Sequence, residues 1–534
     1  MKRLWLTVPI LLAFALLQSA SASDAKVTVD LKTVVNILTN SSVGLPASPS
    51  DSEAFDPTSA RYTRLAGVNI LRYPGAPDVA DLYHWSSKSL TRIAGEVQQP
   101  YISPNSDFGT FARNLDDFGT ALIVVNYGSN AKGTGGGDPS EAAAWVAYAN
   151  GDSADNRPIP QSKDSQNWHT VGFWATLRGQ APLPTDDGLN FLRISHPKPF
   201  AIHLWQIGDQ VYDNGYYGNA HSGRVDLHSG SASAGSREKN VELGPSSYGS
   251  RVVEFARTMK AIDPTIRIGA ALATPDGQPT DSDWSSKQWT LDWNQKVLKA
   301  GCSAIDFISL DWQPVSLLPP DWKTLNEADL LNSSRGKVGS ILNSLLRLYS
   351  EDCPKDHLPR IAFSTASVPT WPKLDHPTFD SLWVADTYSV LIETGSEDVT
   401  WPEMHGPTMI SGDGKAFGSA FRGLEMLHIA AYRPGDAFVK ATSSSPMVAV
   451  HATRRRDGLV GLMVINEDPS SPATVRVNIE GASIAPAGRR IDYGRLQQVS
   501  GSGPAVSAVK DLGPKFTIVV PAYTITDILV PLAK

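Results

Sequence analysis

Short apolar runs alternate with longer, helix-like segments from residue 43 to about residue 406. Seven of these runs are clear: GVNILRYPG, TALIVVNYG, FAIHLWQIG, TIRIGAALA, AIDFISLDW, PRIAFSTAS and EDVTWPEMHG. A weaker run, SSVGL, would make eight. Between them, segments such as 138–150 and 247–263 repeat apolar residues at helical spacing, and the second ends at Asp263-Pro264, a helix stop signal. Eight strands that alternate with helices over this length predict a closed parallel (β/α)8 barrel of the TIM type.

The alternative to a closed barrel is an open, doubly wound sheet. Such a sheet usually carries a glycine-rich phosphate loop directly after an early strand. The chain has one glycine-rich stretch, GTGGGDPSE at residues 133–141, but it falls well after its strand. It also lacks both the GxGxxG and the GK[ST] spacings. We interpret it as a flexible loop and prefer the barrel.

From about residue 436 the apolar pattern changes to a period of two. The runs MVAVHATRRRDGLVGLMVIN, ATVRVNIEG and FTIVVPAYTITDILVP alternate in this way, and Asp457-Gly458 is a typical hairpin turn. We predict an antiparallel β-sandwich over residues 436–534, and the alternating segment at 23–42 is expected to add a strand to it. The barrel then covers residues 43–435. The basic run ATRRRDG is interpreted as a solvated turn.

The first 22 residues have the features of a secretory signal peptide. Lys2 and Arg3 form a basic start, an apolar run follows, and Ala20-Ser21-Ala22 is a small-residue cleavage site. A membrane anchor is the alternative, but the apolar run is short for a span and no second long apolar stretch follows it. We therefore expect a secreted or periplasmic protein that has no membrane span after cleavage.

The net charge of -7 shows no basic excess that would favour nucleic acid as a partner. His221 and His228 lie in one loop without zinc-type spacing, so we expect no metal and no cofactor. The two cysteines, Cys302 and Cys353, each precede a strand-like run. If those strands are parallel neighbours, both sulfurs lie at one end of the sheet, and an exported protein could form this disulfide.

In a barrel of this type, function is carried by the carboxyl ends of the strands and the loops that follow them. The candidate positions there are Arg72, Tyr73, Asn126, Trp205, Gln206, Asp209, Gln210, Asp311, Trp312, Gln313, Ser364, Thr365, Trp401, Glu403 and His405. His84 and Trp85, beyond the second strand, are further candidate contacts, although packing is the simpler interpretation. This aromatic and amide-rich set suits a neutral, polyhydroxylated ligand, because amides bond hydroxyls and aromatic faces cover sugar rings.

Several long motifs, in order, carry a resemblance to a known family: LRYPG with DLYHW, VVNYGS with DPSEAAAWVAYAN, the stretch from Trp205 to Gly218, and FARTMKAIDPTIRIGA. Over residues 60–435 the chain resembles the α-L-arabinofuranosidase-type glycoside hydrolases, whose catalytic glutamates follow strands four and seven. The resemblance implies a carbohydrate ligand with arabinofuranosyl or xylan-like units. The residues that match the family pattern intact are Arg72, Tyr73, Asn126, Trp205, Gly208 and His405.

The catalytic positions depart from that pattern. The family's fourth strand reads W-E-x-G-N-E, whereas this chain has Gln206, Asp209 and Gln210 at the polar places, so that the acid/base is a glutamine. The nucleophile of the family's T-E-x-N falls at Thr365. A retaining glycosidase needs two carboxyl groups about 5–5.5 Å apart. Glutamine cannot donate the proton, and threonine is a poor nucleophile without an adjacent base. The usual retaining mechanism is therefore predicted to be lost.

Three acids remain at predicted strand ends, namely Asp209, Asp311 and Glu403. They could be a relocated acid and base of an inverting reaction, whose carboxyls stand about 6.5–9.5 Å apart. They could instead hold Ca²⁺ through oxygen ligands, or simply bond a sugar hydroxyl or an arginine. A buried Arg72 would need an anionic partner, for which Asp209 and Glu403 are the candidates.

Three functions stay open from the sequence. The favoured one is an exported protein that binds a glycan and does not cleave it by the usual route. An active glycosidase that uses the relocated acids is the second. A structural protein that kept the scaffold and binds a protein partner is the third.

Overall fold

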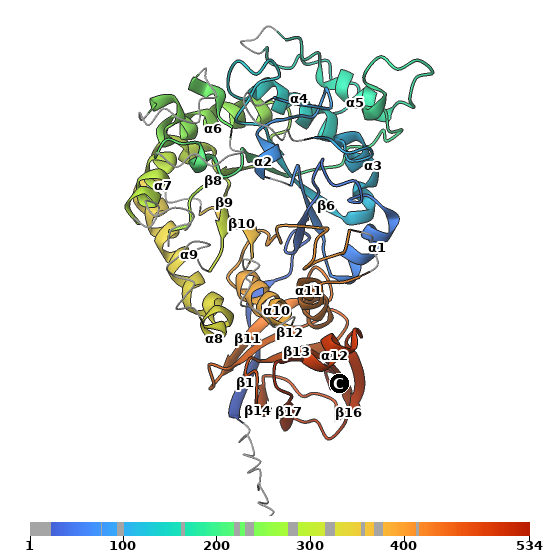
Figure 1. The fold of residues 1–534 in the computed structure, drawn as a ribbon, viewed down its shortest axis with the longest axis vertical. Helices are drawn as coiled ribbons and strands as arrows, with labels where there is room; N and C mark the ends of the chain where they lie inside the picture. Colours follow the sequence, from blue (N-terminus) through green and yellow to red (C-terminus); the bar gives the residue numbers. More distant parts are fainter. Residues whose placement is uncertain are drawn as a thin grey trace, which may run out of the picture.

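The computed structural model describes residues 23–75, 77–92, 101–161, 166–217, 225–229, 240–275, 287–314, 326–353, 358–367, 378–412 and 416–533. The predicted signal peptide and His221 lie outside the described residues. A barrel of parallel strands and surrounding helices stands on a β-sandwich formed by the C-terminal part of the chain (Figure 1). Among the described helices, none combines the length and the apolar character that crossing a bilayer requires.

Seven parallel strands form the barrel sheet, in the order β10-β9-β8-β7-β6-β3-β2. Their bounds are β2 Gly44–Pro46, β3 Ile70–Tyr73, β6 Thr120–Val125, β7 Leu204–Ile207, β8 Arg267–Ala271, β9 Phe307–Trp312 and β10 Arg360–Ala366. The last predicted run, EDVTWPEMHG, closes the barrel with two isolated parallel bridges, from Val399 to Phe363 of β10 and from Thr400 to Gly44 of β2. The Gly44 amide donates to the Val399 carbonyl at 2.9 Å. The predicted barrel-and-sandwich fold is confirmed.

Several helices around the barrel begin at a capping side chain. Asp107, Asp138 and Thr170 each accept a backbone N–H in the first turn of the helix that follows. The bounds are α1 Pro57–Leu65, α2 Pro77–Ala80, α3 Phe108–Phe118, α4 Pro139–Asn150, α5 Val171–Gly179, α6 Pro245–Lys260, α7 Lys287–Gly301, α8 Glu327–Leu331, α9 Ser333–Asp352, α10 Phe379–Glu393 and α11 Ser419–Ala430. Short 3₁₀ turns are η1 Asn190–Leu192, η2 Val211–Asp213, η3 Leu227–Ser229, η4 Val241–Leu243 and η5 Cys302–Ala304.

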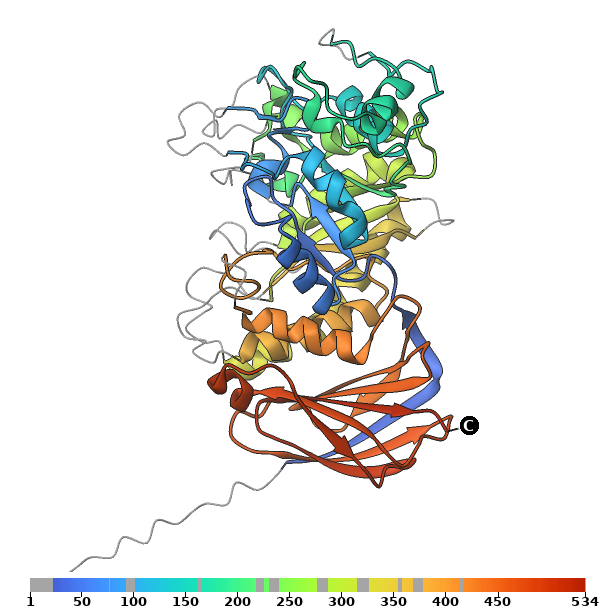
Figure 2. The same ribbon diagram turned by 90° about the vertical axis from the view of Figure 1, so that its right-hand side faces the viewer.

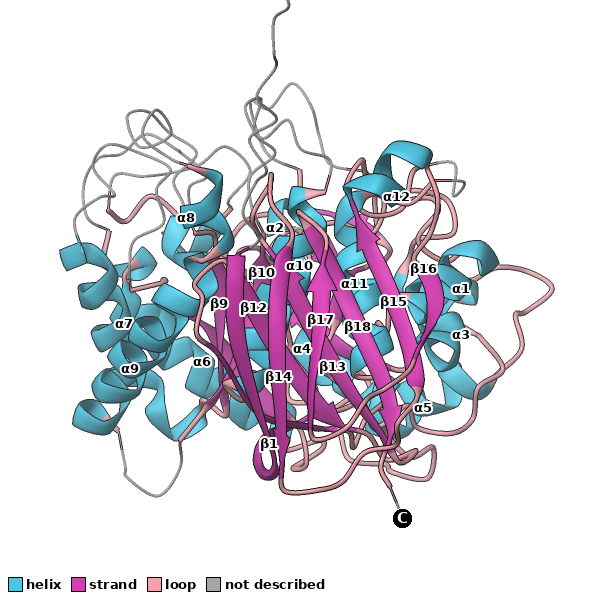
Figure 3. Cartoon of the chain, turned by 90° about the horizontal axis from the view of Figure 1, so that it is seen from below, coloured by secondary structure: helices cyan, strands magenta, loops and turns pink. Residues whose placement is uncertain are grey.

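The sandwich is one nine-stranded sheet that folds over itself, in the order β16-β15-β18-β13-β12-β11-β1-β14-β17 (Figures 2 and 3). Its elements are β1 Ser23–Ile37, β11 Ala437–Ser443, β12 Val448–Arg454, β13 Leu459–Asn466, β14 Ala473–Glu480, β15 Gly488–Gly494, α12 Arg495–Ser500, β16 Ala505–Val509, β17 Lys515–Val520 and β18 Thr524–Pro531. A small hairpin, β4 Tyr83–His84 with β5 Ser89–Leu90, stands apart. β1 pairs antiparallel with β11 and parallel with β14, and its alternate residues Val27 and Val29 enter the sandwich core.

The hairpin between β12 and β13 differs from the sequence interpretation. Arg455 is buried, its Nη2 lies 2.5 Å from Asp457 Oδ2, and its Nη1 donates to the Ile429 carbonyl at 2.7 Å. Its guanidinium also covers the ring of Tyr432. The turn packs against the end of α11, so the interpretation of the basic run as a solvated turn is wrong for Arg455.

Cys302 and Cys353 form a disulfide, with their Cα atoms 5.6 Å apart. Cys302 lies in η5 just before β9, and Cys353 follows α9 just before β10. Because β9 and β10 are parallel neighbours, the two residues reach the same end of the sheet.

Replacing both cysteines by serine is expected to lower the free energy of unfolding by about 2–4 kcal/mol, because the bond restricts the unfolded chain. Urea unfolding of the oxidised wild type and of the double variant measures the difference. The reduced wild type is the control and should match the variant. Equal stability of all three samples would contradict the prediction.

Candidate functional site

A buried ion pair joins two of the predicted strand ends. Arg72 at the end of β3 and Asp209 after β7 are 1 % and 2 % exposed, and Arg72 Nη2 lies 2.7 Å from Asp209 Oδ1. Gln206 Nε2 donates to the same Oδ1 at 3.3 Å and to the Gly208 carbonyl at 2.8 Å. Of the two anionic partners expected for Arg72, the structure shows Asp209. The family pattern has asparagine at this position. In this chain it is Asp209, whose carboxylate neutralises Arg72.

Asp81, which the sequence analysis missed, connects three loops at the same end of the barrel. Its Oδ1 accepts the backbone N–H groups of Tyr127 at 2.9 Å and Gly128 at 3.1 Å, and its Oδ2 accepts the N–H of Asp209 at 3.2 Å. Burial raises the pKa of Asp81 to about 7, and the nearby carboxylates of Asp209 and Asp226 add to the rise, although the backbone N–H groups oppose it. Asp81 lies in the quoted DLYHW motif, but no pattern marks it as a partner of distant backbone groups.

Gln210 and Thr365, the positions at which the resembled family carries its catalytic glutamates, lie after β7 and within β10. Gln210 follows Asp209 in a left-handed conformation, with φ at 46°, and is half-buried. Thr365 of β10 is also half-buried and pairs in register with Asp311 of β9. Ser364 Oγ donates to Asp311 Oδ1 at 3.0 Å. The end of β10 thus presents hydroxyls and no carboxylate, and the nearest acid across the sheet is held by Ser364.

The loop after the eighth barrel segment is tied down by its own side chains. Glu403 Oε1 accepts the Thr408 hydroxyl at 2.7 Å, and Trp401 Nε1 donates to that same hydroxyl oxygen at 3.2 Å. His405 is held by Asp51 Oδ2 at 2.7 Å and Ser59 Oγ at 2.9 Å. All three candidate relocated acids thus have partners within the protein. Across the described residues, no group of three or more His, Cys, Asp or Glu is arranged to hold a metal ion.

Four of the predicted aromatic contacts are packed in the core. Tyr73, Trp85, Trp205 and Trp312 are each at most 1 % exposed. Tyr73 stacks on Phe111 of α3, Trp85 and Trp205 contact Trp145 of α4, and Trp312 stacks on Trp383 of α10. These rings fill the space between the strands and helices. Gln313, which follows β9, is half-buried.

The polar side-chain atoms of His84 and Asn126 are also hydrogen-bonded within the protein. His84 Nδ1 lies 3.0 Å from Glu141 Oε2, and its Nε2 lies 2.8 Å from Thr91 Oγ1. Burial lowers the pKa of His84, but the charge and the hydrogen bond of Glu141 outweigh it, and the pKa is raised. Asn126 Oδ1 accepts the N–H of Ser129 at 2.9 Å. Both residues hold the loops beneath the mouth of the barrel in place.

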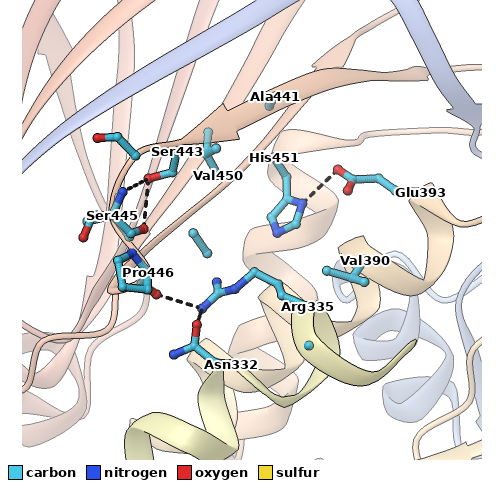
Figure 4. A pocket seen from close by; sticks show the side chains of 14 residues that line it. Asn332, Arg335, Val390, Glu393, Ala441, Ser443, Ser445, Pro446, Val450 and His451 are labelled. Atoms are coloured by element: carbon cyan, nitrogen blue, oxygen red, sulfur yellow. Dashed lines mark hydrogen bonds and ion pairs between the residues drawn. The ribbon is translucent and has the colours of Figure 1, made fainter. Parts of the chain in front are cut away.

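A second ionisable cluster, which the sequence analysis missed, lies between the barrel helices and the sandwich (Figure 4). His451 of β12 lies between two carboxylates of α10, at 2.8 Å from Glu393 Oε1 and 2.9 Å from Asp386 Oδ1. Arg335 of α9 contacts Asp386 Oδ1 at 3.1 Å and Glu467 Oε2 at 2.7 Å. A cavity of about 590 Å³ adjoins these side chains.

The charged groups of this cluster shift one another's pKa values. Burial lowers the pKa of His451, but Glu393 and Asp386 raise it to about 10, so the imidazole is cationic at neutral pH. Burial raises the pKa of Glu467 to about 7, with the negative charge of Asp386 acting in the same direction and Arg335 opposing it. We assign this cluster a structural role, the joining of α9 and α10 to the strands of the sandwich.

No protein-family model matches the chain, and no curated protein matches it by sequence. Solved structures do match its fold, and the three described next are glycoside hydrolases. The α-L-arabinofuranosidase of Thermotoga maritima, solved with arabinose, aligns at a TM-score of 0.62 and 16% identity over 95% of this chain and 100% of that chain. The GH51 arabinofuranosidase of Xanthomonas axonopodis pv. citri aligns at 0.63 and 14% over 95% and 99%. A family 44 xyloglucanase of Paenibacillus polymyxa aligns at 0.61 and 13% over 96% and 100%. The chain therefore has a glycoside hydrolase fold.

Proposed function

We propose that this protein is exported and binds a glycan with arabinofuranosyl or xylan-like units, without cleaving it by the retaining mechanism. The observation that carries the proposal is a set of buried polar atoms with free hydrogen-bonding capacity. Within the described residues, Gln206 Oε1, Asp209 Oδ2 and Arg72 Nε have no hydrogen-bond partner. Buried polar groups are nearly always bonded, so such a set calls for an explanation. One donor and two acceptors are the complement of sugar hydroxyls, which both donate and accept.

The same residues argue against retaining catalysis. The proton donor's place is taken by Gln210, and Asp209 beside it is paired with Arg72. The nucleophile's place is taken by Thr365. Loss of general acid/base help alone typically costs about 10²–10⁴-fold in rate, and here the attacking carboxylate is missing too.

Calorimetric titration against arabino-, xylo- and xyloglucan oligosaccharides tests the binding. The first two follow the resemblance, and the third is added because one structural neighbour is a xyloglucanase. Gln206→Leu is expected to weaken binding about tenfold, the scale of one hydrogen bond to a buried group. Gln180→Leu, on the exposed end of α5, is the matched control and should bind like the wild type. Absence of wild-type binding at millimolar ligand would contradict the proposal.

An active glycosidase that uses Asp209, Asp311 or Glu403 is the second candidate, because all three carboxylates follow barrel strands. We expect no release of 4-nitrophenol from 4-nitrophenyl α-L-arabinofuranoside and no new reducing ends from the oligosaccharides above. Turnover that disappears in Asp311→Asn or Glu403→Gln would establish this candidate instead.

A further inference from the structure

A cavity of about 370 Å³ lies beside the barrel, between the loops after β6 and β7 and the helices α4 and α6. It is separate from the Arg72–Asp209 pair, and the proposed function does not use it. Its lining includes Gly136, Gln161, His228, Glu254 and Arg257.

His228 is fixed in this cavity through one ring nitrogen. Its Nδ1 lies 2.6 Å from Asp226 Oδ1, and Asp226 Oδ2 accepts the amide of Asn214 at 2.9 Å. The ring packs against Tyr127 with the centroids 4.4 Å apart, and the side chain is 8 % exposed. Because the carboxylate accepts at Nδ1, the neutral imidazole carries its proton there, and Nε2 is left as a hydrogen-bond acceptor.

Nε2 faces the cavity and has no hydrogen-bond partner among the described residues. A β-carbon at position 136 would lie 2.1 Å from it, so only glycine leaves room for the tip of the ring. The glycine-rich loop is held by two hydrogen bonds, from the Asn130 N–H to the Gly135 carbonyl at 2.8 Å and from the Gly137 N–H to the Tyr127 carbonyl at 2.7 Å. The stretch is a loop, as the sequence predicts, and these hydrogen bonds fix its backbone next to His228. It forms the wall against which His228 is placed.

The other polar side chains of the cavity offer donors and acceptors in balance. Glu254 and Arg257 stand one turn apart on α6, and Gln161 contributes an amide. Across the described part of the chain, the side chains of these three residues make no hydrogen bond or ion pair. Asp138 and Arg251 also line the cavity, so two carboxylates and two guanidiniums offset each other's charge, which does not favour an anion. With the amide and the imidazole acceptor, the set suits the hydroxyl groups of a neutral sugar.

We propose that this cavity is an additional carbohydrate subsite, in which His228 Nε2 accepts a hydrogen bond from a sugar hydroxyl. The inference rests on the proposed function, since it gives the bound glycan a second point of contact. The two sites are neighbours through Tyr127, whose N–H binds Asp81 and whose ring covers His228. Asp81 in turn accepts the N–H of Asp209. A short ligand would occupy the barrel mouth alone, and a longer chain would reach both.

The experiment compares arabinobiose with arabinohexaose by calorimetric titration. His228→Ala and Glu254→Gln are each expected to weaken hexaose binding about tenfold, the scale of one hydrogen bond to a buried or charged group, and to leave biose binding unchanged. Among the described residues the Glu254 side chain makes no hydrogen bond or ion pair, so Glu254→Gln removes none and is expected to keep the fold. His196→Ala, a half-buried histidine on another loop, is the matched control and should bind both sugars like the wild type.

The outcomes separate the two proposals. If the wild type binds both sugars and both cavity variants also bind them unchanged, or lose both equally, the subsite is refuted and the proposed function stands. If the wild type binds neither sugar, the proposed function fails, and the subsite fails with it. The imidazole ¹⁵N resonances of His228 should shift on addition of the hexaose and stay in place with the biose. A His228 resonance unmoved by a bound hexaose would also refute the subsite.

Discussion

Replacing Asp209 by asparagine is expected to lower the free energy of unfolding by about 3–5 kcal/mol, because it leaves a buried guanidinium without its ion-pair partner. The result would be notable since asparagine is the residue that the resembled family carries at this place. Arg72 is 1 % exposed, and its Nη2 lies 2.7 Å from Asp209 Oδ1. The positive charge of Arg72 also acts on the buried Asp398. Burial raises the pKa of Asp398 to about 7, so near neutral pH it is only partly charged and cannot fully replace Asp209 as the partner of Arg72. Urea unfolding at pH 7 measures the loss.

Two further variants separate the ion pair from the bulk of the side chains. The double variant Arg72→Met with Asp209→Leu removes both charges and is expected to be more stable than Asp209→Asn alone, because no buried charge is left unpaired. Glu403→Gln makes the same acid-to-amide change in a half-buried side chain bonded to Thr408, and should cost about 1 kcal/mol or less. An Asp209→Asn protein as stable as Glu403→Gln would show that the pair contributes little.

The fold could be predicted because its signals are local. Each barrel strand is buried on both faces and reads as a continuous apolar run, as in TALIVVNYG, and a side chain such as Asp138 marks where α4 begins. The last predicted run of the barrel, EDVTWPEMHG, forms no continuous strand. It joins its neighbours only through bridges at Val399 and Thr400, because the chain enters a loop directly after them. A run of apolar letters does not reveal where its backbone pairing stops.

Of the candidate site, the sequence could predict only where each residue lies along its strand. The sequence predicted that Asp209 and Thr365 lie at strand ends, and they do, after β7 and within β10, but it did not predict what their side chains would contact. Asp81 lies in the DLYHW motif, but that motif does not reveal its role, since its partners are backbone N–H groups of residues 46 to 128 positions away. Tyr73 and Trp85 illustrate the converse, because an aromatic residue near a strand end can face the helices as readily as the mouth. Contacts of this kind depend on the tertiary structure.

Replacing His451 by glutamine is expected to cost about 3–5 kcal/mol at pH 7, because it removes the cation between the buried carboxylate of Asp386 and the half-buried carboxylate of Glu393. His451 is 4 % exposed and lies 2.8 Å from Glu393 Oε1 and 2.9 Å from Asp386 Oδ1. These acids belong to α10 of the barrel, whereas His451 belongs to β12 of the sandwich. The variant should therefore weaken the joint between the two, and calorimetric unfolding should separate into two transitions. His196→Gln, a histidine 3.6 Å from the exposed Asp116, should leave the melting curve unchanged.

The pH dependence gives a second, independent test of the same cluster. The pKa of His451 is raised from 6.5 to about 10 in the folded protein, which corresponds to about 5 kcal/mol. This contribution is fully present below pH 6.5 and is lost as the pH rises through 10, because the unfolded chain releases the proton first. Glu467, with a pKa of about 7, has finished its titration by then, and Arg335 stays charged throughout. Between pH 8 and 10 the wild type should therefore lose about 2 kcal/mol of stability that His451→Gln does not lose. Parallel stability curves for the two proteins over that range would mean that the imidazole is not held as a cation by Glu393 and Asp386.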